Sequence, residues 1–319
     1  MDAFRMIAAI LVVFQHTYCI DMGKTGAWLN LLSDACVPFF LIVSGFLFKN
    51  SFKGTDEWFR KYMMRIVWMY LAWSVITLPV SYLIIERGHC DYSVPMKILY
   101  QLRLFFFTGS IGVYWYLLAL GISLFLIYHA YRRKLIWPLG ILAIAGYVIG
   151  CLYNSPFHHG QTFYEGIHVV FGSTRNFLNV GLFYTLIGFL WPAPETRDRT
   201  TFFKIAVLSA MVLSVLVRGV ESNYCGTSFS QALIAISAFA GALYLFPVSE
   251  ARGLTESRNL STGIYLIHYP FILLFDFYLT RGTAMDFPIT LAFSVAVYYI
   301  LRRFLPKSSG ILFGLGRAS

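Results

Sequence analysis

Ten long apolar segments take up most of this chain of 319 residues and limit the folds that it can adopt. About 20 mostly apolar residues are enough to cross the hydrocarbon core of a bilayer as a helix. Soluble domains carry roughly 25% charged residues, whereas this chain has 13%, with 58% hydrophobic residues. Such a chain cannot cover itself with a surface compatible with water, and the sequence therefore predicts an all-α integral membrane protein.

The predicted fold is a bundle of about ten transmembrane helices. We expect them at residues 3–20, 28–48, 63–85, 113–131, 135–153, 177–192, 203–220, 228–248, 261–280 and 286–304. Two other segments, residues 50–62 and 95–108, are too short or too charged to span. We expect both to be amphipathic interfacial or re-entrant helices, on opposite faces of the membrane.

The Lys and Arg residues predict the orientation, because short cytoplasmic connections are enriched in both. If both termini lie in the cytoplasm, the inner segments hold 18 of the 25 Lys and Arg residues. The net charge of +10 is then a property of the inner loops rather than a sign of nucleic-acid binding. We expect one multi-pass domain over residues 1–305 and a basic cytoplasmic tail over residues 306–319.

The first apolar segment carries two basic side chains, Arg5 and His16. Eleven residues are about three helical turns, so both side chains lie on one stripe, roughly 16 Å apart along the axis. Because a basic residue is costly in lipid, this stripe should face a protein interior or a watery cavity. Histidine is a common general base, and the guanidinium of arginine suits phosphate. The alternative is that Arg5 reaches lipid headgroups while His16 bonds a neighbouring helix.

Further motifs follow along the chain. The segment 33–48 (SDACVPFFLIVSGFLF) places Pro38 and the pair Ser44–Gly45 inside a span, where small residues permit close packing or a local break. The other residues of interest are a basic cluster before the third span, an aromatic pair at the start of the fourth and a histidine before a proline in the ninth: Arg60, Lys61, Arg65, Trp115, Tyr116, His268 and Pro270.

In these motifs the chain resembles the acyltransferase 3 family of bacterial membrane acyltransferases, from residue 3 to about 300. The shared patterns are R-x10-H at Arg5 and His16, the VPFF and SGF runs, the basic cluster, and Y-L-I-H-x-P around His268. The resemblance implies a ten-helix bundle in the bacterial inner membrane. It also implies transfer of an acyl group, such as acetyl, from cytoplasmic acyl-CoA to a hydroxyl of an extracytoplasmic glycan, lipid or polymer.

By this resemblance His16 is the catalytic residue, and Arg5 and Arg65 bind the donor acetyl-CoA. One departure concerns the pair of arginines that the family often has before the third span. Here the first position is Tyr62, and Arg60 or Lys61 would substitute for it. Trp115 is a candidate for lining the cavity. His268 either bonds carbonyls freed by Pro270 or has a direct role at the substrate.

A second resemblance concerns GSTRNFLNVGLFYTLIGF and VRGVESNYCG, which are similar to the membrane half of VanT-type serine racemases. That half belongs to the same superfamily and is thought to supply L-serine to a cytoplasmic racemase domain. It implies an alternative function in L-serine uptake for vancomycin resistance, with a cytoplasmic domain or a second copy of the chain as partner. Arg175 and Glu221 would then hold the two charged groups of the amino acid, or else orient an acceptor hydroxyl.

Each of these residues also has a purely structural interpretation. Arg175 and Glu221 could form an ion pair between loops, and Asn176 could cap a helix instead of bonding a ligand. We expect no metal site, because the histidines of the outer loop, such as the adjacent His158 and His159, lack metal-ligand spacing. The sequence contains no Gly-rich phosphate loop, HExxH or GxSxG motif.

Overall fold

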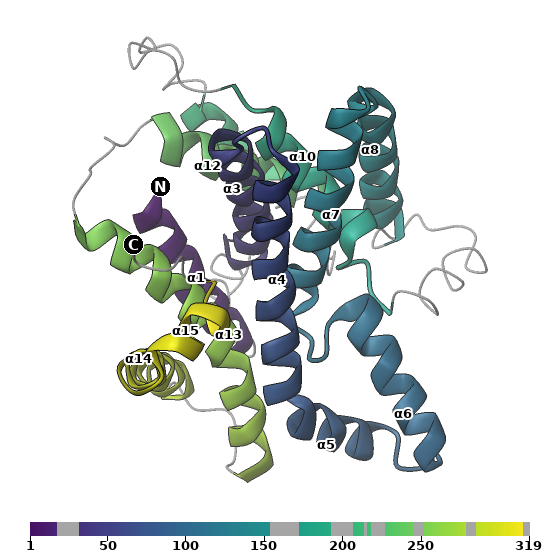
Figure 1. Ribbon diagram of the computed structural model, residues 1–319, viewed down its shortest axis with the longest axis vertical. Helices are drawn as coiled ribbons and strands as arrows, with labels where there is room; N and C mark the ends of the chain where they lie inside the picture. The colour runs from purple at the N-terminus through teal and green to yellow at the C-terminus, as the bar shows by residue number, and fades with distance from the viewer. Residues whose placement is uncertain are drawn as a thin grey trace. The chain divides into compact units, whose positions relative to one another are not determined.

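The computed structural model describes residues 1–17, 32–153, 172–192, 207–213, 216–217, 227–244, 252–278 and 285–314. These residues form helices and connecting segments, with no strand among them (Figure 1). The all-α class is therefore confirmed for the described part of the chain. Two compact units share the chain: one comprises Asp34–Phe59 and Ala119–Glu250 with Met1, and the other comprises Asp2–Ser33, Arg60–Leu118 and Ala251–Ser319.

The first unit is built mainly from α3 (Cys36–Ser51), α8 (Ile136–Tyr153), α10 (Leu182–Leu190) and α12 (Phe229–Tyr244), with the short π-helix η2 (Phe177–Gly181) leading into α10. Most of α7 (Trp115–Arg132) also belongs to it. Helix α3 packs along α10, and α12 also packs on α3 (Figure 1).

Two glycines bring α3 and α10 into close contact. A Cβ atom on Gly45 would overlap the carbonyl oxygen of Thr185, and one on Gly188 would overlap the carbonyl oxygen of Ile42. Small residues at facing positions are a common means of packing membrane helices, since apolar side chains gain little by leaving lipid. The close packing predicted for the Ser44–Gly45 pair is thus present, with Gly188 on the opposite helix.

Replacing Gly45 with alanine should destabilise the first unit. The added methyl group meets backbone that cannot rotate away, and overpacking of this kind costs about 1–3 kcal/mol, occasionally more. Gly140 in α8 offers a matched control, because its added Cβ would meet only Leu186 Cδ2 at 3.9 Å. Thermal unfolding in detergent should show a lower midpoint for Gly45→Ala and an unchanged or higher midpoint for Gly140→Ala. Equal midpoints would contradict the packing argument.

The second unit contains α1 (Asp2–Thr17), α5 (Leu78–Gly88), α6 (Val94–Arg103), α13 (Arg252–Tyr278), α14 (Asp286–Phe304) and α15 (Pro306–Leu312), with most of α4 (Asp56–Ile76). Helix α1 packs along α13, and α14, which is seen end-on in Figure 1, packs against α13. A Cβ atom on Gly263 would overlap the ring of Tyr298, so this glycine sets the close approach of α13 and α14.

Three described helices are long and apolar enough to cross a membrane, at Leu32–Ser51, Ile136–Tyr153 and Asp286–Phe304. Helices α4 and α5 could together form a fourth span, broken by a bend of 57°. Two shorter apolar helices lie at Phe177–Leu190 and Phe229–Tyr244. These helices are candidate membrane spans by length and composition, while the count of ten spans and the inward position of both termini stay predictions.

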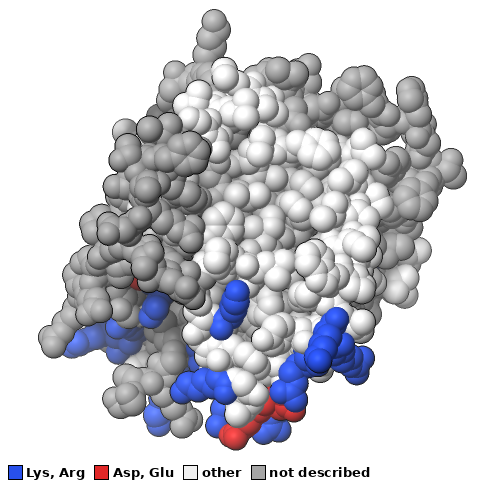
Figure 2. Space-filling model, turned by 90° about the horizontal axis from the view of Figure 1, so that it is seen from above, with Lys and Arg blue, Asp and Glu red and all other residues white. Residues whose placement is uncertain are grey.

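The outward surfaces of these helices are apolar. In α8, Trp137 is 81% exposed and Ile141 is 71% exposed. Figure 2 shows a face on which uncharged residues predominate, with Lys and Arg gathered toward one edge beside Asp and Glu. Exposed apolar surface of this extent is unfavourable in water and suits contact with lipid chains.

Several predicted boundaries differ from the structure. Residues 56–62 form the first turns of α4 instead of belonging to a separate interfacial helix. Helix α13 begins at Arg252, nine residues before the predicted start at 261. Half of the span predicted at 203–220 lies outside the described residues. The predicted tail begins as the packed helix α15, whose Leu312 carbonyl accepts a hydrogen bond from Trp73 Nε1 at 2.7 Å.

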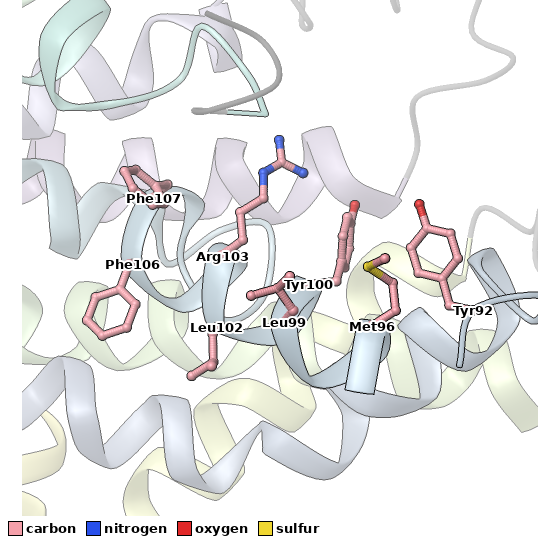
Figure 3. A pocket seen from close by; sticks show the side chains of 8 residues that line it. All are labelled: Tyr92, Met96, Leu99, Tyr100, Leu102, Arg103, Phe106 and Phe107. Atoms are coloured by element: carbon pink, nitrogen blue, oxygen red, sulfur yellow. The ribbon is translucent and has the colours of Figure 1, made fainter. Parts of the chain in front are cut away.

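The segment predicted at 95–108 forms α6 followed by the π-helix η1 (Leu104–Thr108). An open pocket of about 450 Å³ lies along it, lined by Tyr92, Met96, Leu99, Tyr100, Leu102, Arg103, Phe106 and Phe107. Figure 3 shows the hydroxyl groups of Tyr92 and Tyr100 and the guanidinium of Arg103 pointing to one side, while Leu102 and Phe106 point to the other. This segregation is typical of an amphipathic helix at a membrane surface.

Candidate functional site

The stripe predicted on the first helix is present and faces inward. Helix α1 runs without a break from Asp2 to Thr17, so Arg5 and His16 lie on one rigid element. Between them, Ala9 and Val13 are 0% exposed and Val12 is 1% exposed. Because these residues share the face of Arg5 and His16, the two basic side chains border the surface that packs into the second unit.

Helix α13 is the element that packs against this face. His16 lies next to His268, with ring centroids 5.5 Å apart. At the other end of α1, Arg5 lies within electrostatic range of Arg258. The two helices therefore run in the same direction, with an arginine near the beginning and a histidine about three turns later on each. The predicted topology likewise makes the first and ninth spans parallel.

Two aromatic rings complete the surroundings of His16. Its ring centroid lies 5.0 Å from that of Tyr269, at an interplanar angle of 67°. His16 and Tyr269 are half-buried, whereas His268 is 0% exposed. His16 is thus accessible beside a fully buried polar partner, an arrangement suited to a residue that handles a substrate proton.

Hydrogen bonds from the segment before α7 fix this part of α13. Pro270 has no amide hydrogen to bond the Leu266 carbonyl in the helix, and the hydroxyl of Tyr114 donates to that carbonyl instead, at 3.0 Å. The hydroxyl of Tyr265 donates to the carbonyl of Val113 at 2.7 Å. The carbonyl freed by the proline is therefore satisfied by Tyr114 rather than by His268.

The other end of the stripe is electropositive. Arg5 interacts electrostatically with Tyr116, Asp2, Arg258 and Tyr62. Arg5 Nη1 lies 4.0 Å from Asp2 Oδ1, and the Arg5 side chain is only 15% exposed. Its buried Nε has no hydrogen-bond partner among the described residues. A guanidinium held in this way can accept an anionic ligand.

Few carboxylates offset the positive charge at this end of the stripe. Tyr62 interacts electrostatically with both Arg5 and Arg65, so the position that departs from the family pattern lies in the same cluster. The carboxylate of Glu256, two residues before Arg258, is engaged by Arg302. Asp2 is thus the one carboxylate paired with Arg5 in the described part of the chain.

The other predicted residues of the second unit are placed as follows. Arg60 and Arg65 are exposed on α4, and the side chain of Arg65 lies beside Gly314, whose added Cβ would be 3.6 Å from Arg65 Cδ. Trp115 is the first residue of α7 and is 7% exposed. Among the described residues, no group of three or more His, Cys, Asp and Glu side chains is arranged to hold a metal ion.

Arg175 and Asn176 lie in the first unit, and Glu221 lies outside the described residues. The guanidinium of Arg175 pairs with Asp34 at 4.0 Å and is 44% exposed. The Asn176 oxygen accepts from the amides of Leu178 and Asn179 at the start of η2. Its amide nitrogen donates to the Ser173 carbonyl and to the Asn179 side chain. Asn176 therefore caps η2, in agreement with the structural interpretation of this residue.

The sequence interpretation missed Arg258 and Tyr269. A signal for Arg258 exists, because it precedes His268 by ten residues, almost the spacing of Arg5 and His16. A pair of arginine and histidine about three turns apart thus occurs on both of the helices that pack together. Tyr269 carries no such signal, since the chain has 21 tyrosines and sequence gives no reason to choose this one.

These features define a membrane protein with an inward stripe of histidines at one end and arginines at the other. Comparison with protein families assigns residues 1–303 to the acyltransferase domain of the acyltransferase 3 family. The match covers nearly the whole chain, and the protein belongs to this family.

Two curated relatives are both amino-acid racemases from Enterococcus faecalis. One is 24% identical over 230 residues, which is 66% of this chain and 30% of the relative. The other is 28% identical over 126 residues, which is 36% of this chain and 17% of the relative. The chain thus spans less than a third of the length of either relative. These relatives fit the racemase-associated branch of the family, and no solved structure matches the chain.

Proposed function

We propose that this protein is an O-acyltransferase of the bacterial inner membrane, with both termini in the cytoplasm. It would move an acyl group, expected to be acetyl, from cytoplasmic acyl-CoA to a hydroxyl of an extracytoplasmic or lipid-linked acceptor. The observation that carries the proposal is the half-buried His16 beside the buried His268, on a helix whose other end holds Arg5 near Arg258.

The proposed reaction needs only one proton-transfer group. His16 takes the proton of the acceptor hydroxyl as the oxygen attacks the thioester carbonyl. The new carbon–oxygen bond forms, the carbon–sulfur bond breaks, and His16 returns the proton to the leaving thiolate of CoA. The products are an ester and free CoA, with no metal or redox partner required.

The arginine cluster would hold the donor. Acyl-CoA carries several phosphate groups, and guanidinium groups bind phosphate through paired, charge-assisted hydrogen bonds. We assign donor binding to Arg5, Arg258 and Arg65, with Arg60 close by in sequence. On the acceptor side we retain Arg175 and Glu221 as candidates, together with Trp115 as a residue of the cavity wall.

A second function has support from the relatives. Both are named amino-acid racemases, and the part that this chain matches covers at most 30% of their length. A membrane module that supplies L-serine to a racemase would need groups that bind an amino acid, and would not need acyl-CoA. Arg175 and Glu221 are the residues that this alternative assigns to the substrate.

Ligand-dependent stability separates the two functions. Acetyl-CoA should raise the unfolding temperature of the purified protein, because a ligand that binds only the folded state stabilises it by about 2.7 kcal/mol at one hundred times its Kd. L-Serine should have no effect. Release of CoA thiol from acetyl-CoA should accompany the shift. A shift with L-serine and none with acetyl-CoA would reject the transferase in favour of uptake.

A further inference from the structure

His268 has one ring nitrogen whose role is explained by the fold and one whose role is not. Nδ1 lies 3.0 Å from the carbonyl oxygen of Ile264, one turn earlier in α13. Nε2 is buried and has no hydrogen-bond partner among the described residues. A buried polar atom without a partner costs about 1–3 kcal/mol, so a fully buried histidine in this state calls for a function.

The contact with Ile264 determines the tautomer. A carbonyl oxygen can only accept a hydrogen bond, so Nδ1 must carry the proton and donate it. In the neutral ring, Nε2 is then an acceptor with a free lone pair. His268 therefore presents a fixed acceptor, on a side chain that is 0% exposed.

Three aromatic rings near His268 are candidates to donate a hydrogen bond to Nε2. Tyr265 lies with its centroid 5.9 Å away, but its hydroxyl donates to the Val113 carbonyl. Tyr269 is 6.2 Å away. His16 is the nearest of the three at 5.5 Å, and its ring is tilted by only 34° from that of His268. The structure does not join the two rings by a hydrogen bond, because Nε2 has no partner among the residues that it describes. At this centroid separation, rotation of the half-buried His16 ring about its side-chain bonds can bring one of its nitrogens within hydrogen-bonding reach of Nε2.

We propose that His268 is the positioning residue of His16, and that rotation of the His16 ring lets Nε2 of His268 accept an N–H hydrogen bond from it. This inference rests on the proposed acyl transfer. The bond leaves the second nitrogen of His16 unprotonated, ready to take the proton of the acceptor hydroxyl. When His16 becomes an imidazolium, His268 stabilises the charge by hydrogen bonding and takes no proton itself.

A comparison with serine hydrolases sets the expected size of the effect. There a carboxylate holds the catalytic histidine in its tautomer, and removing that carboxylate costs about 10⁴-fold in kcat. His268 offers a neutral acceptor, which binds an imidazolium less strongly than a carboxylate does. We therefore expect its loss to lower kcat by about 10²-fold or more.

Two substitutions separate this role from a structural one. In His268→Asn the amide group replaces Nδ1 and can still donate to the Ile264 carbonyl, while nothing replaces Nε2. In His268→Gln the longer side chain can place its oxygen at the position of Nε2. With acetyl-CoA as donor and water as acceptor, thiol release should fall by about 10²-fold in His268→Asn and by less than about tenfold in His268→Gln. The KM for acetyl-CoA should stay unchanged in both variants.

A kcat of His268→Asn equal to the wild-type value would overturn the inference, because that variant keeps the backbone contact. So would a higher KM at constant kcat, which would indicate a substrate-binding residue. If the wild-type protein releases no thiol while acetyl-CoA leaves its stability unchanged, the proposed function fails instead.

A measurement on the wild-type protein tests the hydrogen bond without turnover. With ¹⁵N-labelled histidine, NMR should show one histidine that is protonated only at Nδ1, and a coupling across a hydrogen bond from its Nε2 to a nitrogen of a second histidine. His16→Gln should abolish the coupling. A protonated Nε2 on His268, or the absence of any coupling between histidines, would reject the hydrogen bond.

Discussion

Replacing His16 with alanine should give a folded protein that scarcely releases thiol from acetyl-CoA. General acid–base groups contribute about 10²- to 10⁴-fold to rates. His16 is the one histidine of α1, and it is half-buried. Because Arg5 and Arg258 lie at the opposite end of the stripe, the stabilisation of the protein by acetyl-CoA should persist. The measurement is the thiol release rate, with the acetyl-CoA-dependent shift in unfolding temperature recorded on the same sample.

His89 supplies the control for this substitution. It belongs to the same unit and stacks on Tyr92, with ring centroids 4.5 Å apart, in the connection between α5 and α6. His89→Ala should release thiol at the wild-type rate. Turnover near the wild-type rate in His16→Ala would remove the proposed base, whereas loss of both turnover and the acetyl-CoA shift would show that the variant had lost its binding site.

The stripe itself could be predicted from the sequence because it depends on helical period alone. Arg5 and His16 are eleven residues apart in an apolar run without proline or glycine, so one helix had to carry both on one face. The partner of that face could not be predicted in the same way. Hydropathy marks which segments span a membrane and does not say which spans touch, since apolar helices pack with many neighbours equally well. The pairing of α1 with α13 is therefore a result of the structure.

The third predicted span shows how a local signal can be overlooked. Residues 63–85 read as one apolar helix, whereas the structure has α4 and α5 bent by 57° around Thr77. Pro79 stands at the start of α5. Because proline disfavours helical geometry in the residue before it and lacks an amide hydrogen, it predicts a break at this place. The hydropathy of residues 63–85 alone does not reveal this break.

The second prediction concerns the donor end of the stripe. Arg5→Gln should raise the KM for acetyl-CoA by about 10- to 100-fold, because a hydrogen bond to a charged group contributes about 1.5–3 kcal/mol. The effect on kcat should be smaller, since Arg5 is three turns away from His16. Arg5→Lys should restore part of the affinity, as lysine keeps the charge and loses the paired donors. Arg303→Gln, an exposed change at the end of α14, should leave KM unchanged.

A donor without phosphate groups tests this prediction most directly. S-Acetylpantetheine carries the thioester of acetyl-CoA and none of its phosphates. If Arg5 binds phosphate, the wild-type protein and Arg5→Gln should use S-acetylpantetheine equally, each with a high KM. If Arg5 instead supports the fold of α1, the variant should lose activity with both donors. Equal losses of activity with both donors would show that Arg5 supports the fold and does not bind phosphate. The buried Nε of Arg5, which has no partner among the described residues, favours phosphate binding.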